Sequence, residues 1–258
     1  GGSKKKKNIN SKKILDDFFK IIKKRYIFST YESVELTKEA IQLKLGMDVT
    51  FVNIISDYID LNDDYEIEKI IEYMKLDKRF SKYGYWRPGL GFGGGHIERG
   101  LKMFESNKNK FQNRIIKATI NYNESRIFFV SKIIKSNNIK NIGIWGLSYK
   151  KNTNSTFRSY SRRLIELLKN KYSYLCFDES CRFENMFNKK YNIIYSEDKR
   201  EILKKTDCLL ILSDWDQFKM LDKSYFDILA KKVFFDPYMF YSKHKDYFRS
   251  LNIKYYNL

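Results

Sequence analysis

The sequence has 258 residues, of which 43% are apolar and 31% are charged. A chain of this length and composition can bury a hydrophobic core, which excludes a disordered or fibrous protein. Its longest apolar stretches, such as residues 208–212, are far shorter than the roughly 18 residues that a membrane-spanning helix needs. The lysine-rich start also lacks the apolar segment of a signal peptide.

The cysteine count indicates the compartment. Cys176, Cys181 and Cys208 are odd in number and form no Cys-x-x-Cys pair, so the sequence predicts neither a disulfide framework nor a metal site. We therefore expect a reducing, cytoplasmic environment.

The chain is strongly basic, with 50 Lys and Arg against 31 Asp and Glu and a net charge of +19. Residues 1–25 hold ten basic side chains, including the run Lys4–Lys7, and two acidic ones. A nucleic acid or another polyanion is therefore one candidate partner. The enrichment in Lys, Asn, Ile, Tyr and Phe also fits a compositional bias of the genome, and no nucleic-acid-binding motif is present.

The first half of the sequence is predicted to be helical. Apolar residues at spacings of three and four predict a helix over residues 11–24, and a short strand is expected over 26–29. A long helix is predicted over 33–60, with Ser33 as its N-cap. Its apolar stripe must be covered by a partner surface. The stripe consists of Ile41, Leu45, Val49, Val52, Ile55 and Ile59.

The next elements follow from turn signals and from the same periodicity. Residues 62–64 form a predicted turn, 65–75 a helix and 109–135 a second long helix. Between the last two, residues 83–95 hold one of the two prolines and six of the twelve glycines, which predicts a loop.

From residue 138 onward, strands and helices alternate. Strands are expected at 139–144, 172–178, 207–213 and 233–236, and helices at 159–169, 199–204 and 224–231. Strands separated by single helices indicate right-handed crossovers and a largely parallel sheet. The predicted fold class is therefore α/β, with a helical region followed by a Rossmann-like domain.

The densest chemical signal is the segment Arg87-Pro-Gly-Leu-Gly-Phe-Gly-Gly-Gly-His96, with five glycines in residues 89–95. Glycine lets the backbone approach a ligand closely and turn its amides toward an anion or a sugar hydroxyl. The segment lacks the Gly-Lys-Ser/Thr ending of a P-loop. A flexible loop explains such a run equally well when it stands alone.

Together with three further blocks, this segment resembles the UDP-glucose/GDP-mannose dehydrogenase family. The loop is similar to the family's Pro-Gly-x-Gly-Phe-Gly-Gly-Ser-Cys-x-x-Lys-Asp. The other blocks are Val34-Glu-Leu-Thr-Lys38 with Gln42 and Phe51-Val-Asn53; Gly143-Ile-Trp-Gly-Leu-Ser-Tyr-Lys150 with Arg158-Ser159; and Ser213-Asp-Trp-Asp-Gln-Phe218 followed by Phe235-Asp-Pro-Tyr238. The resemblance covers about residues 14–245 and the blocks occur in the family's order.

The resemblance implies a set of catalytic positions, several of which are changed. Lys38 matches the lysine that stabilises developing negative charge at the reacting carbon. Gln42 stands in place of an asparagine, and His96 in place of the cysteine that forms the thioester. Arg99 and Gly100 replace a lysine and an aspartate. An imidazole forms no comparably stable thioester, so these changes argue against oxidation of a sugar alcohol to an acid.

The resemblance also implies binding residues. The backbone of Phe92, Gly93 and Gly94, together with Arg99, Tyr149 and Lys150, is expected to contact the nucleotide sugar. Arg158 matches an arginine that reaches toward the NAD cofactor. Tyr238 replaces an arginine that contacts the diphosphate.

The domain organisation follows from the same comparison. We expect a remnant or linker at 1–30 after an absent NAD-binding domain, a central helical dimerisation domain at 31–137, and a UDP-sugar-binding domain at 138–258. The implied partners are a nucleotide sugar, with UDP-glucose favoured, and a second copy bound through the long helix.

Three functions stay open at this stage. The first is an NAD-dependent 6-dehydrogenase of the UDP-glucose type, without its NAD domain and with an altered active site. The second is a catalytically inactive homologue that binds nucleotide sugars or acts as a scaffold. The third is a polyanion-binding protein that reuses the fold.

Overall fold

The computed structural model describes residues 9–59, 65–80, 84–105 and 110–257. The Lys4–Lys7 run and the turn predicted at 62–64 lie outside the described residues. Among the described helices, none is long and apolar enough to cross a membrane.

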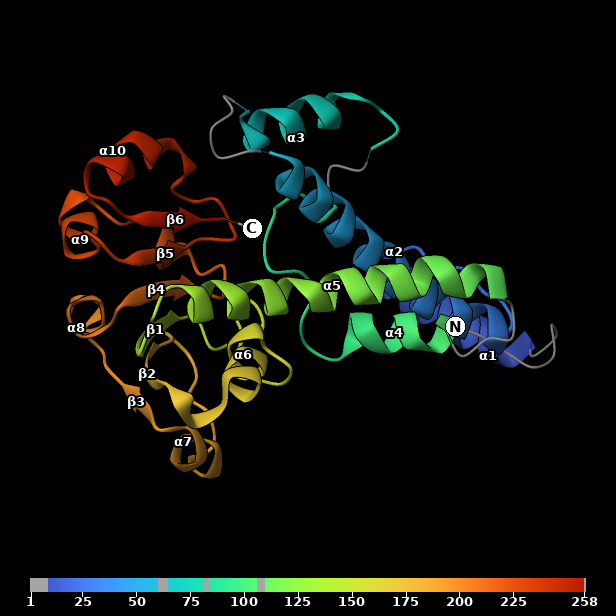
Figure 1. Ribbon diagram of the computed structural model, residues 1–258. Helices are drawn as coiled ribbons and strands as arrows, with labels where there is room; N and C mark the ends of the chain where they lie inside the picture. Colours follow the sequence, from blue (N-terminus) through green and yellow to red (C-terminus); the bar gives the residue numbers. More distant parts are fainter. Residues whose placement is uncertain (1–8, 60–64, 81–83, 106–109, 258) are drawn as a thin grey trace.

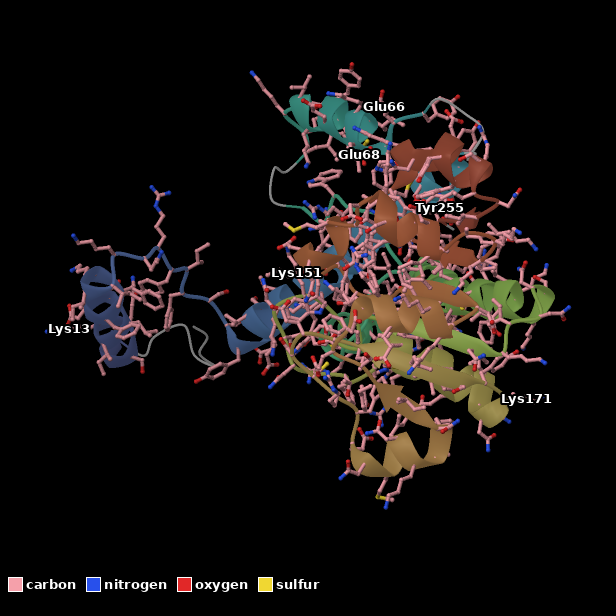
Figure 2. All side chains as sticks on the ribbon, turned by 90° about the vertical axis from the view of Figure 1, so that its left-hand side faces the viewer. Lys13, Glu66, Glu68, Lys151, Lys171 and Tyr255 are labelled. Carbon is pink, nitrogen blue, oxygen red and sulfur yellow. The ribbon has the colours of Figure 1, made fainter. Side chains whose placement is uncertain are left out.

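The helical region occupies the first half of the chain, as predicted. It consists of α1 (Ile9–Ile21), α2 (Tyr31–Tyr58), α3 (Ile67–Leu76), α4 (His96–Glu105) and α5 (Lys110–Ser136). The N-cap of α2 is Thr30, whose hydroxyl accepts a hydrogen bond from the Ser33 amide, so the assignment of Ser33 as N-cap was wrong. In Figure 2, α1 with Lys13 stands apart from the rest of the molecule.

The strand predicted at 26–29 does not form. Only Ser29 makes a bridge, because Tyr26 folds back onto α1. The ring of Tyr26 stacks on Phe19 with centroids 4.7 Å apart, and its hydroxyl donates to Asp16 at 2.5 Å. The segment therefore satisfies its side chains locally instead of pairing along a sheet.

The second half forms a six-stranded sheet in which every neighbouring pair is parallel, with the order β3-β2-β1-β4-β5-β6. This confirms the predicted α/β class. Its elements are β1 (Asn141–Trp145), α6 (Tyr160–Leu168), β2 (Ser173–Phe177), α7 (Asn185–Tyr191), β3 (Ile193–Tyr195), α8 (Lys199–Lys205), β4 (Cys208–Ile211), α9 (Lys223–Ile228), β5 (Val233–Phe235), α10 (Lys245–Ser250) and β6 (Lys254–Tyr256), with 3₁₀ turns at Lys169–Lys171, Asp216–Lys219 and Ser242–His244.

Successive side chains along the central strands point alternately to the two faces of the sheet, and each face has its own hydrophobic core. Ile142 and Ile144 of β1 point into one core with α5, α6 and α7, whereas Trp145 points into the other with α8, α9 and α10. Helix α5 is shared between the two halves of the molecule. Figure 1 shows it running from the helices to the sheet. Its first turns pack against α4, and its last turns cover the sheet.

The turn after β1 is held by one buried carboxylate. Asp178, at the end of β2, is 1% exposed. Its Oδ2 accepts from the amides of Leu147 and Ser148 at 2.7 and 3.0 Å, and from Trp215 Nε1 at 3.3 Å. Its Oδ1 accepts from the amides of Ser180 and Cys181. The loops after β1, β2 and β4 are therefore fixed to one another.

We expect Asp178→Ala to destabilise the fold by about 3 kcal/mol, because it leaves several buried N–H donors without an acceptor. Urea unfolding followed by circular dichroism measures the effect. Asp246→Ala, at an exposed position on α10, is the control and should change stability by less than about 0.5 kcal/mol. Equal effects of the two substitutions would contradict this role of Asp178.

Candidate functional site

A cavity of about 700 Å³ lies where the glycine-rich loop meets α3 and three loops of the sheet. Six aromatic and four basic residues are among those that line it. It is lined by Val49, Ile67, Glu68, Ile71, Lys75, Gly84, Tyr85, Trp86, Arg87, Pro88, Gly89, Gly91, Phe92, Gly93, Ile97, Tyr149, Lys150, Asp214, Lys219, Tyr238, Met239 and Phe240.

The charge of the wall suits an anionic ligand. Four of the lining side chains are basic (Lys75, Arg87, Lys150 and Lys219) and two are acidic (Glu68 and Asp214). Lys75 lies over the Trp86 ring, with Nζ 5.9 Å from the ring centroid. Aromatic faces beside cations can stack on a base and meet the phosphates of a nucleotide.

Buried polar side chains of two helices hold the glycine-rich loop in place. Asn53 of α2 accepts from the Gly89 amide at 2.9 Å, and Arg126 of α5 donates to the Gly89 carbonyl at 2.9 Å. Arg126 also pairs with Asp57 at 2.6 Å. Asn123 of α5 accepts from the Phe92 amide at 2.8 Å and donates to the Phe92 carbonyl at 3.3 Å. The loop is therefore an ordered wall.

Gly91 shows why this loop needs a glycine. Its φ is +125°, a region that residues with a side chain rarely adopt. A Cβ at this position would overlap Asn123 Oδ1 and the Tyr160 hydroxyl. Glycine here makes room for the hydrogen bonds that hold the loop, in addition to bringing the backbone to the cavity.

The sheet supplies the opposite wall through the loop after β1. Tyr149 packs on the glycine run, since a Cβ at Gly94 would lie 3.0 Å from its ring. Lys150 Nζ lies 5.6 Å from the centroid of the Tyr149 ring. Four of the predicted substrate-binding residues, Phe92, Gly93, Tyr149 and Lys150, thus meet at one cavity, whereas Gly94 and Arg99 do not line it.

The catalytic residues predicted from the resemblance lie elsewhere. Lys38 and Gln42 are one turn apart on α2, and His96 and Arg99 are exposed on α4. None of these four lines the cavity. They sit near the crossing of α2 and α4, where a Cβ at Gly100 would lie 2.5 Å from Gln42 Cβ and 3.1 Å from Glu39 Oε2. The glycine at position 100 therefore has a packing reason, which is the close approach of the two helices.

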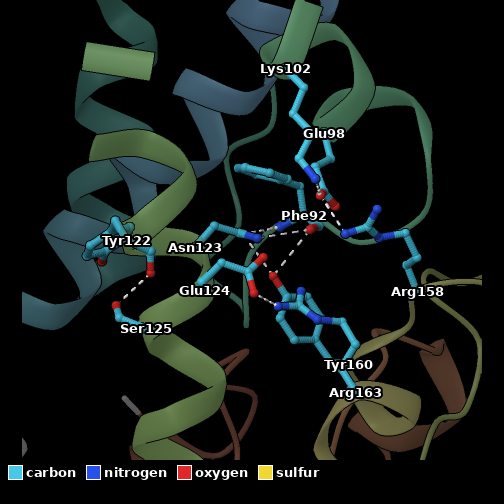
Figure 3. Close-up of polar contacts among 10 residues, drawn as sticks. All are labelled: Phe92, Glu98, Lys102, Tyr122, Asn123, Glu124, Ser125, Arg158, Tyr160 and Arg163. Carbon is cyan, nitrogen blue, oxygen red and sulfur yellow. Dashed lines mark hydrogen bonds and ion pairs between the residues drawn. The ribbon is translucent and has the colours of Figure 1, made fainter. Parts of the chain in front are cut away.

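Arg158, predicted to reach the cofactor, makes an ion pair within the chain. Its guanidinium donates to Glu98 Oε1 at 2.5 Å, and Lys102 Nζ lies 2.6 Å from the same oxygen. Glu98 is 8% exposed. The pair links α4 to the segment that precedes α6 (Figure 3).

The sheet does not fit a dinucleotide, although its strand order is that of dinucleotide-binding domains. In such domains, the amides after the first strand bind the pyrophosphate. Here the Leu147 and Ser148 amides donate to Asp178, and the Trp215 side chain lies on the same carboxylate. The amides that would bind a pyrophosphate are therefore already used.

No cysteine replaces the one expected at position 96. Cys176, Cys181 and Cys208 are free thiols buried in the sheet region. Burial raises the pKa of the Cys208 thiol to about 12, and it raises the pKa of Cys176 and Cys181 strongly as well. In the described part of the chain, no three His, Cys, Asp or Glu side chains are grouped so that they could hold a metal ion.

Several residues of the site were not predicted. Asn123 and Arg126 lie on α5 beside the buried residues Ile127 and Val130. Two polar residues three positions apart on an otherwise apolar helix face were the sequence signal that could have indicated their role. Trp86 and Lys219 carry no motif. Tyr238 was noted only as a replaced arginine, and its ring packs against Gly89.

Family models match the helical region and the sheet region of this chain separately, as two domains of one family. Residues 32–125 match the central domain of the UDP-glucose/GDP-mannose dehydrogenase family, and residues 143–243 match the family's UDP binding domain. The chain belongs to the UDP-glucose/GDP-mannose dehydrogenase family.

Individual relatives are distant. The chain is 24% identical over 222 residues to a UDP-glucose 6-dehydrogenase of Rickettsia conorii, which covers 82% of this chain and 51% of the relative. It is 25% identical over 205 residues to one of Bacillus subtilis, covering 76% and 44%. The chain thus spans about half the length of these relatives.

The fold is shared with a solved UDP-glucose dehydrogenase of Pyrobaculum islandicum. The TM-score is 0.76 at 20% identity, over 92% of this chain and 55% of that one. A UDP-D-ManNAc dehydrogenase of Pyrococcus horikoshii aligns with a TM-score of 0.66 at 18% identity, over 82% and 49%.

One buried carboxyl beside the cavity predicts a dependence of stability on pH. Burial raises the pKa of Asp236 from 3.8 to about 7. Its Oδ2 accepts from the Tyr241 amide and the Tyr255 hydroxyl, whereas Oδ1 has no partner among the described residues. The folded state therefore binds the proton more tightly than the unfolded state does. The stability that Asp236 contributes is complete below about pH 4 and is lost as the pH rises through about 7.

We expect Asp236→Asn to lose less stability than the wild type between about pH 4 and pH 8, because the amide does not ionise. Urea midpoints measured across this range test the difference. Asp246→Asn on α10 serves as the exposed control and should follow the wild type. Parallel curves for wild type and Asp236→Asn would contradict the raised pKa.

Proposed function

We propose that this chain is the nucleotide-sugar-binding part of a dehydrogenase of the UDP-glucose 6-dehydrogenase type. The observation that carries the proposal is the cavity between the two matched domains, which combines the glycine-rich backbone, aromatic rings and four basic side chains. In this proposal the ligand is a nucleotide sugar, and UDP-glucose is the first candidate because the relatives from Rickettsia and Bacillus carry that name.

The proposal gives each wall a role. The backbone around Phe92 and Gly93 contacts the sugar and the diphosphate, Lys150 and Lys219 neutralise the phosphates, and Trp86 offers a ring to the base. The domain limits expected from the sequence, 31–137 and 138–258, place one wall in each domain. Three free, buried cysteines support the reducing cytoplasm as the compartment.

The proposed reaction, oxidation of the sugar C6 alcohol by NAD, is taken from the family resemblance. The residues that line the cavity do not by themselves indicate it. NAD would supply the hydride acceptor for this oxidation. Within the described residues the sheet does not fit this cofactor, so we derive no step through it. Lys38, Gln42 and His96 keep the catalytic assignment as a proposal that rests on the family resemblance alone, because none of them lines the cavity. The resemblance gives Lys38 the role of supplying positive charge to the reacting oxygen.

A second candidate function, an inactive homologue that binds the nucleotide sugar without turnover, is favoured by His96 in place of the thiol. Both candidates require the same ligand site. An assay with UDP-glucose and NAD together distinguishes the active enzyme from the inactive homologue. Only the active enzyme forms NADH, which is measured by its absorbance at 340 nm. The polyanion reading instead predicts binding that collapses as salt rises.

We expect UDP to bind the wild-type chain with one site per chain in a calorimetric titration at about 150 mM salt, where nonspecific charge attraction is screened. Lys150→Ala should weaken UDP binding about tenfold, because a charge-assisted hydrogen bond to phosphate is lost. Lys245→Ala on α10, a lysine that does not line the cavity, is the matched control. Binding that is absent in the wild type, or lost equally in both variants, would contradict the proposed site.

A homodimer through α2 is also proposed, but on a different face from the predicted stripe. Val52 and Ile59 of that stripe are buried against α3 in their own chain. The exposed apolar side chains on α2 include Leu36, Phe51, Ile54 and Tyr58. These follow one another at helical spacing on one side of α2, so this side, defined here as the outer α2 face, is the surface that a second copy would cover.

Phe51→Glu should convert the dimer to monomers, because a charge would be buried at the centre of the outer α2 face. Light scattering at micromolar concentration measures the mass. Tyr73→Glu, at an exposed position on α3, provides the control and should leave the mass of the dimer unchanged. A wild-type chain that is monomeric under these conditions would rule the proposed interface out.

A further inference from the structure

Three side chains near the start of α6 reach across from the sheet to the helical region (Figure 3). Arg158 pairs with Glu98 of α4, and Arg163 pairs with Glu124 of α5. Between them, the Tyr160 hydroxyl donates to Asn123 Oδ1 at 2.8 Å and lies 3.3 Å from the Phe92 carbonyl oxygen. Tyr160 is thus the one of the three that reaches the backbone of the glycine-rich loop.

The Phe92 backbone determines which way the Asn123 amide points, and the Tyr160 hydroxyl adds a second hydrogen bond to the same amide oxygen. Asn123 Oδ1 receives two donors, the Phe92 amide and the Tyr160 hydroxyl, while Nδ2 donates to the Phe92 carbonyl. A rotated amide would present its NH₂ group to the Phe92 amide hydrogen and its oxygen to the Phe92 carbonyl, so the Tyr160 hydroxyl anchors Asn123 in the orientation that the Phe92 backbone requires. Burial raises the pKa of Tyr160 far above its ordinary value, so the hydroxyl stays a neutral donor.

The loop conformation that results is the one that lines the cavity. Gly91, Phe92 and Gly93 all belong to the lining. The Phe92 side chain is itself buried with Leu101 and Ile116, so both the ring and the backbone of this residue are held. Two buried side chains, Asn123 at 3% exposure and Tyr160 at 2%, therefore stand directly behind the proposed ligand-binding backbone.

We propose that Tyr160 is a positioning residue for ligand binding: through Asn123, it holds the Phe92 backbone in the conformation that the nucleotide sugar requires. Tyr160 is the first residue of α6, which packs on the sheet, and Phe92 belongs to the helical region, so the contact also makes the loop geometry depend on the docking of the two regions. The inference rests on the proposed function in that the cavity is the ligand site.

The test uses Tyr160→Phe, which keeps the ring in its core and removes only the hydroxyl. Tyr174→Phe is the matched control, because Tyr174 is a buried tyrosine of the sheet whose hydroxyl donates to the Lys169 carbonyl at 2.6 Å and does not contact the loop. Two quantities are measured for each variant of the 258-residue chain: the dissociation constant for UDP by calorimetry, and the hydrogen-exchange rate of the Phe92 amide.

We expect Tyr160→Phe to weaken UDP binding about tenfold and to accelerate exchange at Phe92, while Tyr174→Phe changes neither. A loss of thermal stability in both variants with unchanged UDP affinity and unchanged exchange at Phe92 would overturn the proposal, because it would reduce Tyr160 to core packing. In a wild type that binds no UDP, the proposed function fails, and exchange at Phe92 still decides whether Tyr160 holds the loop.

A double-mutant cycle tests whether Tyr160 acts through Asn123. Asn123→Ala alone should weaken UDP binding at least as much as Tyr160→Phe does. Adding Tyr160→Phe to Asn123→Ala should then cause little further loss. Fully additive losses in the cycle would overturn the route through Asn123.

Discussion

The fixed backbone of the glycine-rich loop is the constraint on which the rest of the site depends. Asn53 and Arg126 hold Gly89, and Asn123 with Tyr160 holds Phe92. All four side chains are buried and come from α2, α5 and α6. A polar group buried without a partner costs free energy, so each side chain restricts the loop to a conformation that satisfies it. The glycines permit this conformation, but the helices impose it.

The same arrangement explains how the helical region and the sheet region form one cavity. Helix α5 packs on α4 at its start and covers the sheet at its end, so it fixes the distance between the loop and the strands. The loop after β1 then brings Tyr149 and Lys150 to the glycine run. The carboxylate of Asp178 fixes this second loop by accepting hydrogen bonds from the Leu147 and Ser148 amides. These amides are therefore not free to bind the pyrophosphate of a dinucleotide.

Much of the fold could be predicted because the spacing of apolar residues along a helix or strand follows which of its side chains are buried. The helices α2 and α5 and the central strands have strongly patterned side chains. Helix α4 and the elements α7, β3, α10 and β6 were missed because they are short and partly exposed. The strand expected at 26–29 does not form, because the Tyr26 ring stacks on Phe19 of the preceding helix instead. Sequence motifs located Phe92, Tyr149 and Lys150, but not Asn123 or Tyr160, whose roles depend on a packing contact between residues far apart in the chain. The +19 charge left a polyanion partner possible beside a compositional bias of the genome, and the cavity together with the match to a UDP binding domain favours a smaller anion.

The central claim is that one ligand bridges both walls of the cavity. Hydrogen exchange by mass spectrometry, with and without saturating UDP-glucose, tests it most directly. The account predicts slower exchange at once in the glycine-rich loop (84–95), in the loop after β1 (146–151) and around Tyr238–Phe240, with no change in α10. Protection of one wall alone, or protection spread over the basic surface and lost with added salt, would contradict it.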